Sequence, residues 1–207
     1  MAAGSGGAGG ASAGAGGDAG SPAADAAASD DGGSLADSGP APSPDGPPAS
    51  SRPDAMGAPC ATGSRYAFTV RSFAAQTGSF TAYFTASPSR APTNSVIGLS
   101  DGQKYLHDDY AAIVRFGTSG NLDARDGDRY TSLTPIRYQI TDYHFRLVVN
   151  VPAQTYSAYV SSDGMPEITI GTDLKFRDSA GTADRLSHWG VEAIESHQTR
   201  VCGFLVQ

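Results

Sequence analysis

The stretch FRLVVNVPAQTYSAYV, residues 145–160, carries the pattern that decides the fold. Its odd positions from Phe145 to Val151 are apolar, whereas the even positions between them are polar apart from Val148. A period of two is typical of a strand with one buried face. Pro152 fixes its own φ in a turn, and the alternation restarts at Tyr156. The stretch therefore predicts a β-hairpin.

Short strand signals recur through the rest of the chain after residue 60. The predicted strands, besides the hairpin, cover residues 65–73, 79–87, 95–100, 111–116, 121–125, 135–140, 167–171, 174–176, 188–195 and 200–206. Only 179–187 has the composition of a helical turn. Many short strands separated by turn residues are typical of a sandwich or a barrel.

Two details of this arrangement can be predicted. Consecutive strands at 65–73 and 79–87 are expected to pair, and the alternation in 135–140 directs Ile136, Tyr138 and Ile140 inward. A two-sheet antiparallel jelly roll fits best, because it brings the first and last strands together. The predicted fold class is all-β.

The first 59 residues differ sharply in composition. They contain no aromatic residue, no Val and no Ile, and consist mainly of Gly, Ala, Ser, Pro and Asp. Such a segment buries too little apolar surface to offset the entropy lost on ordering its backbone. We predict a disordered, stalk-like tether over 1–59 and one globular domain over 60–207, which is long enough for a hydrophobic core.

The charge is concentrated in the tether. Residues 1–59 carry seven Asp and one Arg, whereas the remaining chain has 14 acidic and 13 basic residues. A nearly neutral domain has no electrostatic reason to bind nucleic acid or an anionic membrane surface. The chain also lacks a run of about 18 apolar residues, which a membrane-spanning helix needs.

The two cysteines lie near the ends of the predicted domain. A bridge between Cys60 and Cys202 would join its first segment to its last and contribute about 4–5 kcal/mol in an oxidising compartment. The alternative is two buried thiols, since free Cys packs as a small apolar residue. Placement at the two ends favours the bridge.

The opening residues MAAGSGGAGG lack both the basic and the apolar region of a signal peptide. The chain is therefore either cytosolic or a part of a longer exported precursor. The stalk-like composition of 1–59 favours export, with an extracellular or surface-tethered domain.

Several segments together resemble a known kind of module. They are GLSDG, AAIVRFGTSGNLDARDGDRY, YHFRLVVNVPAQTYSAYV, FR at 176–177 and VCGFLV. This set resembles the accessory modules of concanavalin A-like lectin/glucanase jelly-roll type, which occur in bacterial secreted carbohydrate-active proteins and are similar to laminin-G and pentraxin folds. The resemblance implies a jelly roll over nearly all of 60–207 and a role toward carbohydrate. Its motifs are structural, so they identify no reaction.

The catalytic residues of enzymes on this fold are not evident. A retaining glucanase needs two carboxylates about 5–5.5 Å apart, and Glu192 and Glu195, three positions apart, point to opposite faces of a strand. A polysaccharide lyase needs a His or Tyr base and a group that neutralises a uronate. The suitable residue types are present without the lyase motifs, at Arg137, Gln139, His144 and Arg146. No Gly-x-Ser-x-Gly elbow and no zinc-binding pair occurs. An enzyme is therefore not the leading expectation.

Candidate ligand-binding residues are cationic or aromatic. If the strands follow one another in one sheet, Arg125, Arg137 and Arg146 project outward as a basic stripe beside His144, which would favour a uronate-rich glycan. The alternative is that each Arg pairs with a nearby acid such as Asp123. Aromatic rings outside the core can stack on sugars, and the candidates are Tyr105, Tyr110, Tyr130 and Trp189.

A calcium site is also compatible with the sequence. DARDGD places Asp123, Asp126 and Asp128 around Gly127, and Ca²⁺ binds carboxylate and carbonyl oxygens on a bent loop. Asp-Gly is equally the commonest pair in tight turns, so a plain hairpin turn explains the same residues. No other cofactor is implied.

These observations favour a monomeric, non-catalytic module that is exported and tethered. It would bind a polysaccharide or be displayed toward one. The alternatives are a structural or adhesive surface domain without a sugar site and, third, a polysaccharide lyase.

Overall fold

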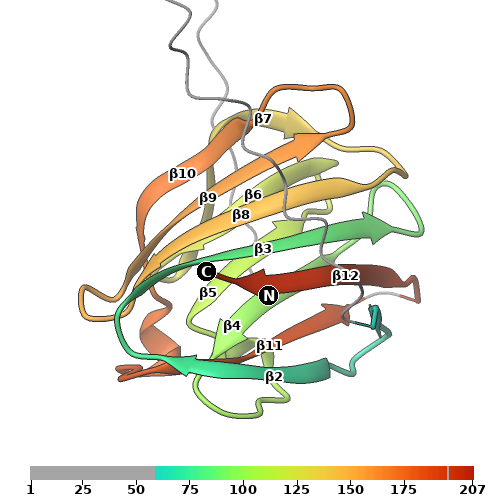
Figure 1. The fold of residues 1–207 in the computed structure, drawn as a ribbon. Coiled ribbons are helices and arrows are strands. Elements are labelled where there is room, and N and C mark those ends of the chain that lie inside the picture. Colours follow the sequence, from blue (N-terminus) through green and yellow to red (C-terminus); the bar gives the residue numbers. More distant parts are fainter. Residues whose placement is uncertain (1–58, 195) are drawn as a thin grey trace, which may run out of the picture. The chain divides into compact units, whose positions relative to one another are not determined.

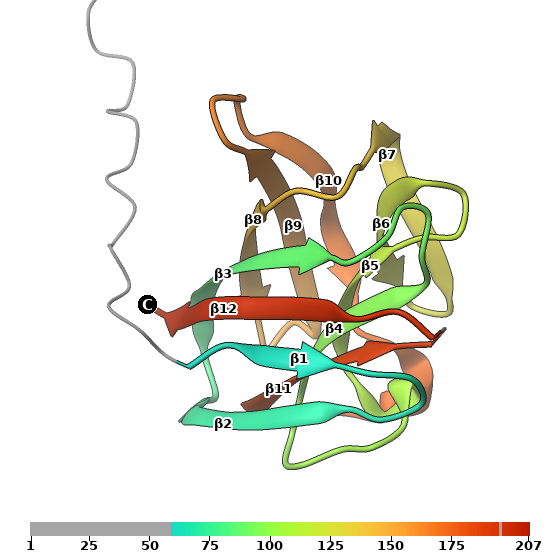
Figure 2. The same ribbon diagram turned by 90° about the vertical axis from the view of Figure 1, so that its right-hand side faces the viewer.

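A computed structural model describes residues 59–194 and 196–207. Their twelve strands form two six-stranded antiparallel sheets that are layered as a sandwich (Figures 1 and 2). This architecture confirms the predicted all-β, two-sheet fold class. The predicted tether covers residues 1–59, and its residues 1–58 lie outside the described part of the chain.

Sheet I has the strand order β1-β12-β3-β8-β9-β10 and faces the viewer in Figure 1. In that order its strands are Ala61–Gly63, Thr199–Val206, Ser79–Pro88, Tyr143–Asn150, Thr155–Ser162 and Ile168–Lys175. Sheet II has the order β2-β11-β4-β5-β6-β7. Its strands are Thr69–Gln76, Leu186–Ala193, Ser95–Ser100, Ala112–Phe116, Asn121–Asp126 and Arg129–Arg137. Two short 3-10 turns, η1 at His107–Asp109 and η2 at Asp178–Ala180, lie between strands.

The hairpin predicted from residues 145–160 is present as β8 and β9. Phe145 lies opposite Val160 and Val149 opposite Tyr156, as an antiparallel register requires. The turn is closed by the amide of Gln154, which donates to the carbonyl of Val151 at 3.0 Å. Because the inward residues of both strands are buried, the hairpin forms part of the wall of the sandwich.

The core lies between the sheets and takes side chains from both. The ring of Phe116 in sheet II meets that of Phe145 in sheet I edge-on, with centroids 5.9 Å apart. Tyr156 in sheet I is fully buried, and its hydroxyl lies 2.8 Å from the carbonyl oxygen of Ile113 and 2.5 Å from that of Arg125. Burial raises the pKa of this hydroxyl, so it remains a neutral link between the sheets.

The predicted pairing of 65–73 with 79–87 is wrong. β2 pairs with β11 in sheet II, whereas β3 pairs with β12 and β8 in sheet I, so the chain crosses between layers after Gln76. Adjacent strands in the sequence need not share a sheet when the connection spans the edge of the sandwich.

Three smaller expectations are corrected. The strands predicted at 167–171 and 174–176 are one strand, β10, with register shifts inside it. Ile136 and Tyr138 are buried as predicted, but Ile140 is 65% exposed because β7 ends at Arg137. The predicted helical turn over 179–187 is limited to η2, and Leu186 already belongs to β11.

The disulfide between Cys60 and Cys202 is formed, with a Cα–Cα distance of 4.2 Å. It joins the residue before β1 to β12, the strand that pairs with β1. This confirms the bridge rather than two free thiols. In the described part of the chain, no helix is long and apolar enough to cross a membrane.

Candidate functional site

The outer face of sheet I carries a row of three residues from adjacent strands. In the antiparallel register Tyr83 of β3 lies opposite Arg146 of β8, which lies opposite Tyr159 of β9. All three alternate with buried residues and are therefore directed outward, where they remain half-buried. We call these three the tyrosine–arginine row. Leu205 of β12 extends it beyond Tyr83.

Arg146 is held in place by its neighbours. Its guanidinium carbon lies 3.9 Å from the ring centroid of Tyr159, and its Nε and Nη2 donate to the two carboxylate oxygens of Glu167 at 2.9 and 2.5 Å. The hydrogen bonds to Glu167 raise the pKa of Arg146, so the side chain is always charged. A fixed planar cation beside aromatic rings is a geometry that supports recognition of sugars and their acidic substituents.

Polar groups flank the row on the same face. His144, two residues from Arg146, lies 2.9 Å from the hydroxyl of Thr85 through Nδ1 and 2.8 Å from Asp163 through Nε2. On the opposite side of the row, Thr81 and Ser157 lie across from Val148. The face therefore combines rings with hydroxyl groups, as sugar binding requires.

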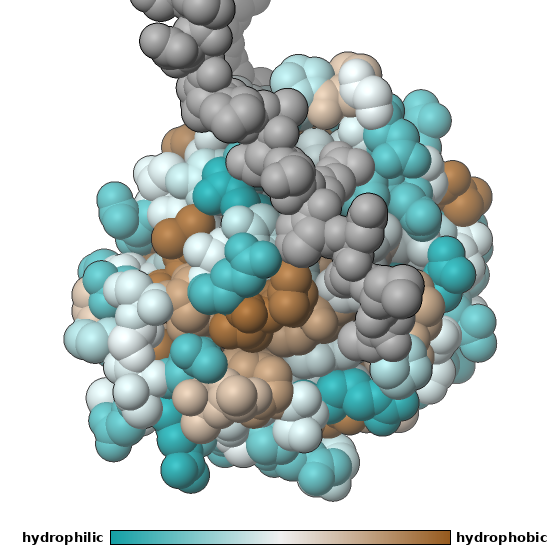
Figure 3. All heavy atoms as spheres, in the orientation of Figure 1, coloured by the Kyte–Doolittle hydropathy of each residue, from teal (hydrophilic) through white to brown (hydrophobic). Residues whose placement is uncertain are grey.

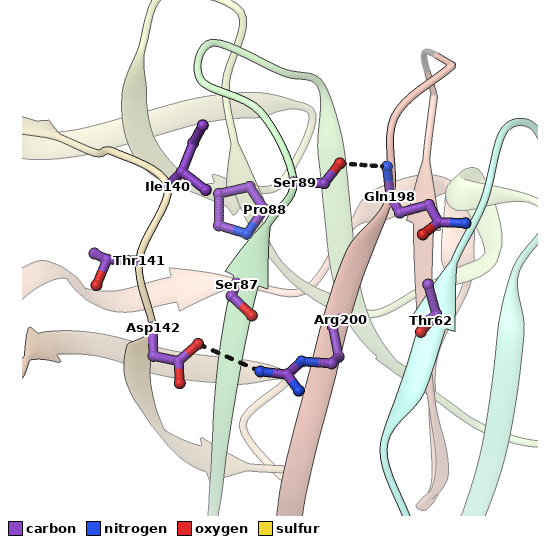
Figure 4. A pocket seen from close by; sticks show the side chains of 9 residues that line it. All are labelled: Thr62, Ser87, Pro88, Ser89, Ile140, Thr141, Asp142, Gln198 and Arg200. Atoms are coloured by element: carbon purple, nitrogen blue, oxygen red, sulfur yellow. Dashed lines mark hydrogen bonds and ion pairs between the residues drawn. The ribbon is translucent and has the colours of Figure 1, made fainter.

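A groove of about 340 Å³ opens at one end of this face (Figure 4). Its lining comes from β1, from β3 and the residue after it, from β12 and the residue before it, and from the β7–β8 connection: Thr62, Ser87, Pro88, Ser89, Ile140, Thr141, Asp142, Gln198 and Arg200. Thr62, Arg200 and Ser87 lie side by side on successive strands. Hydroxyl and amide groups thus surround one cation and the exposed side chain of Ile140.

The space-filling view shows the outer side of sheet I as a mixed surface (Figure 3). Hydrophobic residues gather near its centre and hydrophilic residues surround them. Such a surface is suited to a ligand with both apolar and hydroxylated sides.

Part of the outer face of sheet II, over β4 and β11, is covered instead. Residues 101–111, here called the covering segment, place the ring of Tyr110 over two glycines of the sheet: a Cβ at Gly98 or Gly190 would lie within 3 Å of that ring or its hydroxyl. Tyr110 stacks on Phe68 with centroids 4.4 Å apart and is fully buried. Its hydroxyl donates to the carbonyl of Lys104 at 3.0 Å. This hydrogen bond joins two parts of the covering segment.

A buried arginine fastens the covering segment. Arg177, only 7% exposed, forms an ion pair with Asp108 and donates to the carbonyl of His107 at 3.2 Å. Glu192 of β11, two residues after Gly190, is 8% exposed, and burial raises the pKa of its carboxyl group. The ion pair of Arg177 stabilises the covering segment, whereas burial of the Glu192 carboxylate is unfavourable. Neither group presents a surface to a ligand.

Sheet II also carries an internally paired arginine cluster. Arg115 donates to both carboxylate oxygens of Asp123 at 2.9 and 2.7 Å and lies 3.5 Å above the ring centroid of Tyr130. Arg125 lies 4.7 Å from the same ring and donates to the carbonyl of Gly127 at 3.1 Å. Burial raises the pKa of Asp123, although the bonds from Arg115 oppose that rise.

The structure contradicts the predicted basic stripe. Arg125 and Arg137 belong to β6 and β7 of sheet II, whereas Arg146 and His144 belong to β8 of sheet I. The chain crosses between the sheets after β7, so the three arginines cannot line one face. The predicted alternative, pairing with acids, holds for Arg146 with Glu167, while Asp123 pairs with Arg115 instead.

Two of the four predicted sugar-stacking aromatics are buried. Tyr110 is 0% and Trp189 4% exposed, and Trp189 stacks on Phe204 inside the sandwich at 5.0 Å. Tyr130 is half-buried beneath Arg115. Tyr105 is exposed, in the covering segment.

The predicted calcium ligands do not gather. Asp123 is bound to Arg115, Asp126 accepts from the amide of Lys175 at 2.9 Å, and Asp128 lies 3.6 Å from Arg125. Across residues 59–194 and 196–207, no three His, Cys, Asp or Glu side chains form a set that could hold a metal ion. A plain hairpin turn between β6 and β7 is formed by Gly127, at φ 54°, and Asp128. Glu195 of the considered carboxylate pair lies outside the described residues.

The sequence reasoning missed Tyr83, Tyr159 and Arg200. A signal was present, because the alternation that buries Phe84 and Ala158 directs Tyr83 and Tyr159 outward. The choice of candidate rings favours aromatics in loops, and it therefore leaves out these two strand tyrosines.

Comparison with known proteins supports the fold. No protein-family profile matches the chain. Gellan lyase from Bacillus sp. is 27% identical over 121 residues, which make up 56% of this chain and 5% of that protein. A sialidase structure matches with a TM-score of 0.52 at 10% identity, over 72% of this chain and 15% of the sialidase. The likeness to the sialidase structure shows a shared β-sandwich fold.

A lectin shows a weaker likeness. Lectin I-B4 from Griffonia simplicifolia gives a TM-score of 0.45 at 8% identity, over 69% of this chain and 82% of the lectin. The chain spans only a small part of the gellan lyase and of the sialidase, so their activities are not transferred by the match.

Proposed function

We propose that residues 60–207 form a carbohydrate-binding domain that holds a polysaccharide against the outer face of sheet I. The observation that carries the proposal is the register of the tyrosine–arginine row, Tyr83, Arg146 and Tyr159. It places one aromatic side chain on each side of a cation, in a line across three strands. Aromatic side chains bind the apolar side of a sugar ring, and the flanking hydroxyls match its hydroxyl groups.

The wider evidence fits an exported polysaccharide binder. The formed disulfide is typical of an oxidising compartment, and the chain is similar to part of a gellan lyase. The composition of 1–59 supports our proposal of a tether that keeps the domain away from an attachment point.

The test is affinity electrophoresis in gels containing gellan or one of several acidic and neutral polysaccharides. Tyr83→Ala and Tyr159→Ala should each weaken binding about fivefold to tenfold, since an aromatic contact contributes roughly 1 kcal/mol or more and 1.4 kcal/mol is tenfold. Their melting temperatures should stay close to that of the parent, because both side chains are only half-buried.

Tyr105→Ala is the matched control, because Tyr105 is 65% exposed in the covering segment, outside sheet I. It should leave binding unchanged. Binding by the Tyr83/Tyr159 double variant at parental strength would contradict the proposal. Failure of every polymer to retard the parent would favour a structural or adhesive domain.

A lyase is the second candidate, favoured by one observation. His144 and Arg146 lie on the same face of β8, so a base and a carboxylate-neutralising group are close together. Lyase activity would appear as ultraviolet absorbance of the unsaturated product on incubation with uronate polymers. If this absorbance appeared with the parent and was lost in His144→Ala, the outer face of sheet I would be an active site and not only a binding surface.

A further inference from the structure

The groove at the end of sheet I contains a cation whose partner is held loosely. Arg200 of β12 lies 3.8 Å from Asp142, and the two side chains are 55% and 46% exposed. This separation exceeds the length of a hydrogen bond, and an exposed single contact of this kind is weak. In Figure 4 the two side chains point toward each other across β3, with Ser87 between them.

Arg146 in the tyrosine–arginine row is engaged differently. Both carboxylate oxygens of Glu167 accept hydrogen bonds from it, and its guanidinium stacks on Tyr159. A ligand carboxylate would have to displace a bidentate partner there. At Arg200 it would have to displace only a longer, solvent-exposed contact.

The backbone under Arg200 is fixed although its side chain is exposed. β12 pairs with β1 on one side and with β3 on the other, and Arg200 lies opposite Thr62 and Ser87. The amide of Gln198 donates to the Ser89 hydroxyl at 2.9 Å, which ties the groove wall (Figure 4). Arg200 is therefore presented from a rigid strand among hydroxyl groups that suit a sugar.

We infer that Arg200 is the specificity-determining residue that binds the carboxylate of a uronic acid unit, while the tyrosine–arginine row binds the neighbouring sugar rings. This rests on the proposed function, because it assigns the ligand class of the same face. When no polymer is bound, Asp142 pairs with Arg200. This competing carboxylate lowers the affinity for an acidic polymer.

The experiment compares polygalacturonate with its carboxyl-reduced, neutral counterpart at low and at high salt. The parent should bind the polyuronate at least tenfold more tightly at low salt, and the preference should shrink as salt screens the charges. Arg200→Ala should abolish the preference, and Arg200→Lys should retain part of it. Asp142→Asn should tighten polyuronate binding severalfold, because the competing carboxylate is gone.

Arg185→Ala is the matched control, since Arg185 is 60% exposed and pairs with Asp101 at 3.0 Å in the covering segment. It should not change the preference. An Arg200→Ala variant that keeps the parental preference overturns the inference, as does a parent with no preference. In either case a loss of binding to both polymers in Tyr83→Ala would leave the proposed function standing.

Discussion

Tyr110 lies on the outer side of sheet II and Tyr83 on the outer side of sheet I, yet the first is fully buried and the second only half-buried. The difference comes from what surrounds each ring. Gly98 and Gly190 leave a depression into which Tyr110 fits, and the covering segment closes over it. At Tyr83 the outward groups directly across from the ring are the large side chains of Arg146 and Leu205. An outward tyrosine can thus be a structural plug or part of an open surface, according to the size of its neighbours.

The largest expected effect on stability comes from a substitution on the covered face. Tyr110→Ala should destabilise the domain by about 3–5 kcal/mol, as for other large buried aromatic side chains, because the depression at Gly98 and Gly190 would be left unfilled. Urea unfolding monitored by fluorescence measures this change. Tyr110→Phe is the control and should lose only about 0.5–1.5 kcal/mol with its hydrogen bond to Lys104. A loss below 1 kcal/mol in Tyr110→Ala would show that the covering segment does not depend on the plug.

The second prediction compares the two faces of one strand. Leu147 points into the core from β8 and is 1% exposed, so Leu147→Ala should cost about 2–5 kcal/mol of stability through lost transfer energy and the cavity left behind. Polymer binding by the folded fraction should be unchanged. An unchanged melting temperature would contradict the inward assignment of Leu147.

The third prediction concerns Glu192 on the covered face. Burial raises the pKa of its carboxyl in the folded state, so ionisation opposes folding. The penalty is absent below the unfolded pKa of about 4.3, grows as the pH rises through the interval up to the folded pKa, and is complete above it. Glu192→Gln should therefore be more stable than the parent at neutral pH.

Thermal unfolding over a pH series measures this advantage, which should disappear in acid. The parent and Glu192→Gln would then have the same melting temperature. An advantage that grew toward acid pH would reverse the sign and contradict the effect of burial on Glu192.

The smallest effects on stability belong to two outward-facing arginines, Arg146 and Arg137. Arg146→Ala should weaken retention by acidic polysaccharides because it removes the centre of the tyrosine–arginine row, whereas Arg137→Ala on sheet II should not. Both variants should melt within a few degrees of the parent, since surface substitutions usually change stability by less than about 0.5 kcal/mol. Equal loss of retention in the two would mean that overall charge, not the row, governs binding.

Alternation along strands predicted the elements well but not their partners. It placed Phe145 and Leu147 inside and Arg146 outside, and the structure agrees. It could not show that the chain changes sheets between β2 and β3 or between β7 and β8, because burial on one face is the same in either layer. The basic stripe failed for this reason.

The site was harder to predict than the fold. Burial of Tyr110 depends on Gly98 and Gly190, which are distant from each other in the sequence and meet only through the pairing of β4 with β11. Arg200 was part of an apolar strand signal, and nothing local indicated that β1, β3 and the β7–β8 connection would form a groove around it. Such properties follow from contacts between strands and have no counterpart in a local pattern.

The disulfide also determines how the domain responds to pulling. Cys60 and Cys202 are separated by 142 positions in the sequence but are joined covalently. Tension applied between the chain before Cys60 and the chain after Cys202 passes through the sulfur–sulfur bond and loads only the part of β12 that follows Cys202, up to Val206. The chain between the two cysteines therefore cannot lengthen while the bond is intact. Reduction would return that length to the chain and expose both sheets to the load.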